Sequence, residues 1–181
     1  MIIGNRIRFR GVERSDLPTF VTWLNDPAIK QGIMIHHPFS QAEEENWYQE
    51  MIKLPVDQRV MGIEAQETDT EDREEQWKLI GSLAFNEIDW RNRAAEFGIM
   101  IGDKTYWNQG YGTEAVRLLV NHGFNTLNLN RIFLKVFENN LRAIRAYEKA
   151  GFVHEGRLRQ AEFRDGKYID MLMMSMLKDE F

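Results

Sequence analysis

The sequence predicts an α/β or α+β domain built on a mixed sheet, and three observations predict this class. Strand-like segments dominate the middle of the chain, and segments with helical spacing and capping residues alternate with them. The chain also ends on two strand-like runs separated by the turn residues RDGK. The length of 181 residues suits one domain, and no repeat or flexible linker divides it. We therefore expect a single domain spanning residues 1–181.

The first third of the chain contains one strand signal and two helix starts. Residues 6–12 alternate between apolar and polar side chains, which predicts a strand. Pro18 is typical of a first helical turn, so a helix should begin after Ser15 or Asp16. Ser40 is followed three residues later by Glu43, which is the pattern of a capping box at the start of a second helix.

The middle of the chain predicts three strands followed by a helix. The strands span residues 59–66, 77–89 and 94–102, and the third is apolar enough to be central in a sheet. The helix should run from about 110 to 125. Its residues at core spacing are Ala115, Leu118, Leu119 and His122.

The last third predicts a buried strand, a helix and a closing hairpin. The strand is residues 131–137, and the helix follows Asn139 or Asn140 as its N-cap. Gly151 should end this helix in a left-handed conformation, with Phe152 folding back against the turn that holds Tyr147. Residues 153–177 then form the hairpin.

Composition and charge exclude several classes of protein. The chain has no cysteine, which excludes disulfides, thiolate metal sites and a cysteine nucleophile. No apolar run reaches the roughly 18 residues of a membrane helix, and no secretory signal opens the chain, so we expect a cytoplasmic protein without a membrane partner. The net charge of −5 gives no basic footprint for a nucleic acid. The acidic residues 66–76 are either a solvated hairpin tip or a negative field that attracts a cationic substrate.

Two glycines, Gly110 and Gly112, stand between a strand and a helix. This order presents unpaired backbone N–H groups to a phosphate, and glycine lets phosphate oxygens approach closely. A tight turn that needs glycine only for its conformation is the alternative. The lysine of a Walker A loop is absent, and alanine replaces the third glycine of a dinucleotide-binding fingerprint.

Three separated motifs resemble the GNAT family of N-acetyltransferases. They are EFGIMIGDKTYWNQGYGTEA, NNLRAIRAYEKAGF and DGKYIDMLMMSML, in the order and spacing of that family. The similarity is to the RimJ/RimL-like branch, which contains ribosomal-protein N-terminal and spermidine N-acetyltransferases. It implies a mixed, mostly antiparallel central sheet with a splayed pair of strands, flanked by about four helices. It also implies transfer of the acetyl group of acetyl-CoA to a primary amine by direct attack on the thioester.

The resemblance assigns residues to the co-substrate, acetyl-CoA. The pyrophosphate would lie on the backbone of the loop that comprises Trp107, Asn108, Gln109, Gly110, Tyr111, Gly112 and Thr113. Trp107 stands where the family often has glutamine or arginine, which removes one side-chain contact. The pantetheine arm would pair with Ile99, Met100 and Ile101, Asn140 would hydrogen-bond to it, and Arg145 would lie near the phosphates.

The resemblance also assigns the catalytic residues. Tyr147 would be the general acid that protonates the leaving thiolate, since a phenol keeps its proton at neutral pH. Glu96 would be the base that deprotonates the amine, with Glu87 or a water chain as alternatives. Packing of Tyr147 on one helical face and surface roles for both glutamates are the structural alternatives.

The acceptor is left open by the sequence. His36 and His37 lie in a loop that borders the acceptor site in this family, but two adjacent histidines without further ligands do not predict a metal site. Polyamine-binding relatives carry acids in this loop, and here acids occur only on the following helix, at Glu43, Glu44 and Glu45. A polyamine, a protein N-terminus and an amino sugar all stay candidates. A catalytically silent acyl-CoA-binding sensor or assembly protein is the alternative function, and the sequence permits a homodimer.

Overall fold

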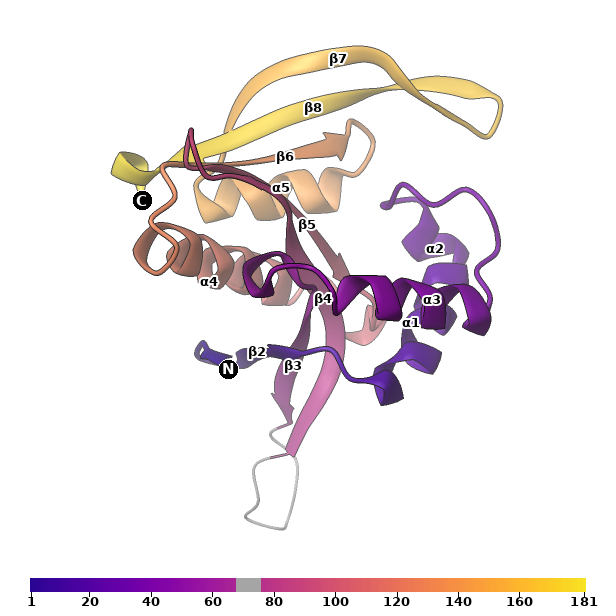
Figure 1. Cartoon of the computed structure of the whole chain (residues 1–181). Coiled ribbons are helices and arrows are strands. Elements are labelled where there is room, and N and C mark those ends of the chain that lie inside the picture. The colour runs from indigo at the N-terminus through magenta and orange to yellow at the C-terminus, as the bar shows by residue number, and fades with distance from the viewer. Residues whose placement is uncertain (68–75) are drawn as a thin grey trace. The chain divides into compact units, whose positions relative to one another are not determined.

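The computed structural model describes residues 1–67 and 76–181, which form two compact units (Figure 1). Unit 1 comprises residues 1–85 and 99–111, and unit 2 comprises residues 86–98 and 112–181, within the described ranges. Strands β4 (Gln76–Asp89) and β5 (Ala94–Ile101) contribute residues to both units. Most of the acidic stretch 66–76 lies outside the described residues, so both interpretations of it stay predictions.

Unit 1 contains an antiparallel arrangement of strands. β1 (Ile2–Ile3), β2 (Ile7–Gly11) and β3 (Met61–Glu67) follow one another, and β3 pairs with β4. β2 alternates as the sequence predicts: Ile7 and Phe9 are buried, whereas Arg8 and Arg10 are half-buried on the other face. β1 has only two residues, which is too short for an alternating pattern, and the sequence did not predict it.

Glu64 on β3 holds the outward face of β2. Its carboxylate accepts hydrogen bonds from Arg8 Nε at 2.6 Å and Arg10 Nε at 2.7 Å, and Arg10 also binds Asp16. Burial by itself would raise the pKa of Glu64, but these two arginines keep it below its ordinary value. Arg10 thus connects the sheet to the segment that starts the first helix.

Three α-helices belong to unit 1: α1 (Leu17–Asn25), α2 (Pro27–Lys30) and α3 (Gln41–Met51). α3 begins as predicted, because Ser40 Oγ accepts from Glu43 N–H while the Glu43 carboxylate accepts from Ser40 N–H at 2.8 Å. α1 and α3 pack side by side through Phe20 and Trp47 (Figure 1). α2 has one turn only and carries no periodic pattern, so the prediction of about four helices misses it.

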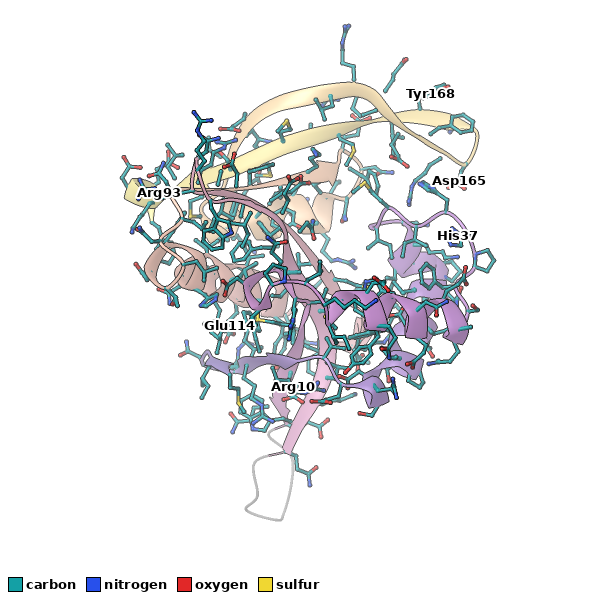
Figure 2. All side chains as sticks on the ribbon, in the orientation of Figure 1. Arg10, His37, Arg93, Glu114, Asp165 and Tyr168 are labelled. Atoms are coloured by element: carbon teal, nitrogen blue, oxygen red, sulfur yellow. The ribbon has the colours of Figure 1, made fainter. Side chains whose placement is uncertain are left out.

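Unit 2 contains paired strands of its own. β5 begins parallel to β6 (Arg131–Phe137), which pairs antiparallel with β8 (Lys167–Leu177), and β8 pairs antiparallel with β7 (Val153–Arg164). Hydrogen bonding gives the strand order β1-β2-β3-β4-β5-β6-β8-β7. Figure 1 shows the β7–β8 hairpin continuing beyond the end of β6, and Figure 2 places Tyr168 near its tip. The mixed, mostly antiparallel sheet confirms the predicted fold class.

Helices α4 (Tyr111–Asn125) and α5 (Leu141–Ala150) complete the regular structure apart from four short 3₁₀ turns. Those turns are Arg14–Asp16, Val56–Gln58, Lys104–Tyr106 and Lys178–Glu180. Ala115 and Leu119 of α4 are fully buried, as the sequence predicts. Leu118 and His122 are only half-buried, because Val116 and Val120 lie closer to the centre of the apolar face.

Candidate active site

The parallel pairing of β5 with β6 is short. It covers Ala94 to Glu96 on β5, where Glu96 is opposite Phe133, whereas β6 stays paired with β8 as far as Phe137. In the described part of the chain, β5 therefore parts from β6 after Glu96. A strand that ends its pairing in this way presents backbone N–H and C=O groups for another partner. This is the arrangement expected of the splayed pair.

The far end of β5, Ile99–Ile101, is held within unit 1 by close backbone packing. A methyl group at Gly81 of β4 would overlap the carbonyl oxygen of Met100, so only glycine lets the two strands approach this closely. A methyl group at Gly102 would likewise overlap the indole ring of Trp23. The backbone N–H of Gly102 donates to Ile80 O at 2.8 Å. The predicted pantetheine strand is thus fixed from two sides.

Trp107 connects the loop of residues 107–113, called the glycine loop from here on, to the predicted pantetheine strand, Ile99–Ile101. Its indole Nε1 donates a hydrogen bond of 2.8 Å to the carbonyl oxygen of Ile101. The family resemblance assigns Trp107 only the loss of a side-chain contact to the cofactor. In the structure this side chain instead bridges the two ends of the segment between the pantetheine strand and the loop, through its hydrogen bond to Ile101.

Ionic contacts hold the segment that leads into the loop. Asp103 caps the 3₁₀ turn through Thr105 N–H at 3.0 Å and binds Lys78 Nζ at 2.9 Å. Lys104 Nζ binds the carboxylate of Asp26, which is also the N-cap of α2. The loop is therefore approached by a rigid segment rather than by a flexible linker.

The glycine loop has the backbone conformation of an anion-binding turn. Asn108 (φ 60°) and Gly110 (φ 87°) are both left-handed, and α4 begins at the next residue, Tyr111. Alternation of left-handed residues before a helix turns successive N–H groups toward one side. Gln109 and Gly110 are exposed. The loop is thus accessible to a phosphate, and Gly110 is required by its conformation as well.

Tyr147 lies in an aromatic cluster of unit 2. Its ring packs edge-on against Phe97 of β5 at 5.9 Å between centroids, and Phe152 contacts both rings. The side chain is 8% exposed, and burial raises its pKa to about 12. Its hydroxyl makes no hydrogen bond within residues 1–67 and 76–181. The phenol therefore holds its proton at neutral pH and is oriented by packing alone.

Asn140 directly precedes α5, and Arg145 lies on this helix. Asn140 is the N-cap, because its Oδ1 accepts from Ala143 N–H at 3.3 Å. Its Nδ2 amide makes no hydrogen bond to the described residues, so a donor remains for a ligand carbonyl. Arg145 is exposed on the same helix.

The two candidate bases differ in their surroundings. Glu96 is half-buried, and its carboxylate binds Lys135 Nζ of β6 at 3.2 Å. Successive side chains of a strand point to opposite faces, so Glu96 lies on the face of β5 opposite Phe97 and its partner Tyr147. Glu87 is an exposed residue of β4.

The acceptor-side residues of the prediction lie on the surface of unit 1. Figure 2 shows His37 on the outside of the loop after α2, where its ring stacks on Phe39 at 5.4 Å. The loop carries no metal site, since no group of three or more His, Asp or Glu side chains in the described ranges is placed to bind one. The three acidic side chains of the following helix, α3, have other environments within unit 1. Glu43 caps the helix, Glu44 is buried, and Glu45 binds Arg14 at 2.8 Å.

Comparison with known proteins adds the decisive observation. The model of the acetyltransferase (GNAT) domain matches residues 6–153, which is most of the chain. This chain belongs to the GNAT family of acetyltransferases. The uncharacterized N-acetyltransferase p20 of Bacillus licheniformis is 33% identical to it over 97% of this chain and 95% of that protein. The spermidine N(1)-acetyltransferase of Vibrio cholerae is 28% identical over 99% and 97% of the two chains.

Solved structures of GNAT acetyltransferases share the fold. The spermidine N-acetyltransferase of Vibrio cholerae, in complex with CoA and spermine, superimposes with a TM-score of 0.83 and 29% identity over 97% of both chains. The chain is therefore an acetyl-CoA-dependent N-acetyltransferase. Among the described residues, no helix combines the length and apolarity needed to cross a membrane.

Sequence reasoning missed one contact of the loop that contains Gly110 and Gly112. The guanidinium of Arg6, at the start of β2, lies against the glycine loop 103 positions further along the chain. Its neighbours Arg8 and Arg10 look the same in the sequence, so no local signal separates them.

Proposed function

We propose that this acetyltransferase acts on a small-molecule primary amine, with Tyr147 as the general acid. The observation that carries the proposal is the Tyr147 hydroxyl, which belongs to a buried side chain and has no hydrogen-bond partner among the described residues. The hydroxyl oxygen is not among the buried polar atoms that lack a partner, so it is accessible to a ligand although its ring is packed on all sides. In the proposed step the amine nitrogen would bond to the acetyl carbon, the carbon–sulfur bond would break, and the phenol proton would pass to the sulfur. The nitrogen would then lose one proton to solvent, and the phenolate would take a proton back from solvent.

The residues that would hold acetyl-CoA fit its chemistry. The exposed left-handed loop around Gly110 supplies N–H donors for the pyrophosphate, and the free edge of Ile99–Ile101 supplies backbone groups for the pantetheine amides. Asn140 Nδ2 supplies one further donor. When bound, acetyl-CoA brings the activated acyl group. This chain fixes its position and provides the proton.

Glu96 is the proposed base, acting directly or through water. An alkyl ammonium has a pKa of about 10.4, so its proton must leave before attack. The Lys135 contact holds the Glu96 carboxylate in one orientation. Glu96→Gln should lower kcat/KM most below pH 8 and make its rise with pH steeper, because the variant then depends on amine that is already deprotonated in solution. Glu87→Gln is the matched control, and an equal loss in both variants would argue for a water chain alone.

The acceptor is proposed as a small amine on the strength of the relatives, which include the spermidine N-acetyltransferase of Vibrio cholerae. The commitments of Glu43, Glu44 and Glu45 within unit 1 argue against a polyamine held by this helix. We therefore expect monoamines or amino sugars to be accepted at least as well as spermidine. A panel of amines, amino sugars and peptide N-termini, followed by thiol release from acetyl-CoA, decides the matter.

A binding experiment tests whether the chain binds acetyl-CoA, on which the whole proposal depends. Acetyl-CoA at about millimolar concentration should raise the melting temperature, because the loop geometry exists only in the folded chain. No shift with a folded sample would contradict the assignment.

We infer that residues 1–181 act as one catalytic domain, since the family match spans residues of both units. The cytoplasmic location and a homodimer stay proposals that fractionation and light scattering can test.

A further inference from the structure

We propose that Arg6 is a phosphate-binding residue of the acetyl-CoA site. The inference rests on the proposed use of the glycine loop and adds a cation from the opposite end of the chain. All residues that carry it, Arg6 and the loop residues Gln109 to Tyr111, lie within unit 1.

Three contacts place the guanidinium at the loop. Arg6 Nη1 donates to the carbonyl oxygen of Gln109 at 3.3 Å, and Arg6 Cζ lies 4.3 Å from the centroid of the Tyr111 ring. A Cβ built on Gly110 would come within 3.4 Å of Arg6 Nη2. The cation therefore lies beside the left-handed Gly110 that turns the loop N–H groups, and not merely on the same face of the molecule.

The position of Arg6 is unlike that of the other arginines on its strand. Arg8 and Arg10 both bind Glu64, and Arg10 also binds Asp16. Those two guanidinium groups serve the sheet and the first helix. Arg6 instead reaches the glycine loop, a segment far from it in the sequence.

The chemistry of the pair favours a phosphate. Backbone N–H groups at a helix start carry only partial charges, whereas CoA carries several full negative charges. A guanidinium adds a full charge and several N–H donors in a planar fork that matches phosphate oxygens, and one of these donors already binds Gln109 O. Stacking on Tyr111 limits the orientations of that fork, which lowers the entropy lost when a ligand binds. Arg6 and the loop amides together form a more complete phosphate site than the loop alone.

Binding of CoA to variants of the full chain tests the proposal by calorimetry. Arg6→Gln should raise the dissociation constant of CoA about tenfold, and Arg6→Lys should recover part of the loss because it keeps the charge. Arg14→Gln is the matched control. Arg14 is an exposed arginine with its own carboxylate, Glu45, and its own ring, Tyr48, away from the loop, so this variant should bind within about twofold of the original chain.

Salt and a truncated ligand sharpen the result. The salt dependence of CoA binding should be weaker in Arg6→Gln than in Arg14→Gln, because one charge contact is missing. With dephospho-CoA, a penalty that disappears assigns Arg6 to the 3′-phosphate, and one that persists assigns it to the pyrophosphate; both support the proposal.

Two outcomes would overturn the proposal. Unchanged CoA binding in Arg6→Gln would reduce Arg6 to a packing residue of the loop. Equal weakening in Arg6→Gln and Arg6→Lys, with no change in salt dependence, would assign the loss to the shape of the loop. Failure of the unmodified chain to bind CoA would contradict the proposed function itself, which separates that failure from an error about Arg6. Circular dichroism and melting temperature confirm that each variant is folded.

Discussion

Phe152 folds back onto Tyr147, with the two ring centroids 6.2 Å apart. The backbone N–H of Phe152 donates to the Tyr147 carbonyl at 3.0 Å, and Gly151 between them is left-handed, with φ at 108°. The helix therefore ends in a way that uses Tyr147 twice, once through its backbone and once through its ring. This confirms the expected helix stop and explains how the phenol is oriented without a hydrogen bond.

Replacing Tyr147 by phenylalanine should remove the proton and leave the aromatic cluster intact. We expect turnover to fall by about 10²- to 10⁴-fold, the usual range for loss of a general acid. The Michaelis constants and the melting temperature should change little, because the lost interaction belongs to the transition state. Steady-state kinetics with an identified acceptor measures the effect. Near-normal turnover would make Tyr147 a packing residue and leave protonation to water.

Trp107→Phe should weaken acetyl-CoA binding because it loosens the strand Ile99–Ile101, which is proposed to pair with the pantetheine arm. The variant keeps an aromatic ring but loses the hydrogen bond from Nε1 to Ile101 O, a contact worth about 1 kcal/mol. We expect the KM for acetyl-CoA to rise about fivefold, with kcat nearly unchanged. Trp90→Phe is the control, because Trp90 is half exposed in the turn after β4. A loss of kcat at constant KM would contradict a role in holding the strand.

Gly112→Val should affect the cofactor more than the fold. Gly112 is the second residue of α4. The helix propensity of valine is lower than that of alanine by only a fraction of a kcal/mol and is higher than that of glycine, so the helix should tolerate the change. The branched side chain of valine would occupy the space proposed for the pyrophosphate. We expect the dissociation constant of acetyl-CoA to rise about tenfold or more. Gly112→Ala, with a smaller side chain, should lie in between. Parallel losses of binding and stability would mean that the glycine serves the turn alone.

The buried carboxyl of Glu44 should make the stability of the fold depend on pH. Glu44 is 2% exposed on the inner face of α3, and burial raises its pKa to about 7 from the ordinary 4.5. As the pH rises from 4.5 to 7, the unfolded chain has already released this proton while the folded chain keeps it. The free energy of unfolding therefore falls across this window and levels off above it.

Glu44→Gln tests that dependence. The variant should be more stable than the original chain at pH 8, by about 1–3 kcal/mol, and the difference should vanish near pH 4. Denaturant unfolding over this pH range measures both curves. Glu50→Gln on the same helix is the control, since Glu50 is exposed and pairs with Lys53. Parallel curves for the Glu44 variant and the original chain would refute the raised pKa.

The sequence by itself determined the elements whose signals are local. The Ser40–Glu43 capping box, the Asn140 cap, the Gly151 stop and the turn at Asp165-Gly166 all depend on residues within a few positions of each other. Such contacts form within a single turn, so a contiguous stretch contains the whole physical cause. The order of the three motifs added the family, which the match to the GNAT domain confirms.

Only the tertiary structure decided how the site is supported. Ser15 and Asp16 were equivalent candidates to cap α1; Asp16 directly precedes the helix, but its carboxylate makes no cap hydrogen bond and binds Arg10 of β2 instead. Glu44 reads as a surface acid beside Glu43 and Glu45, and the packing of α3 on α1 buries it. Arg6 reaches its loop across 103 positions, and Gly81 is required because Met100 of the next strand lies against it. A side chain's partner across such distances is fixed by strand register and helix packing, which no local pattern encodes.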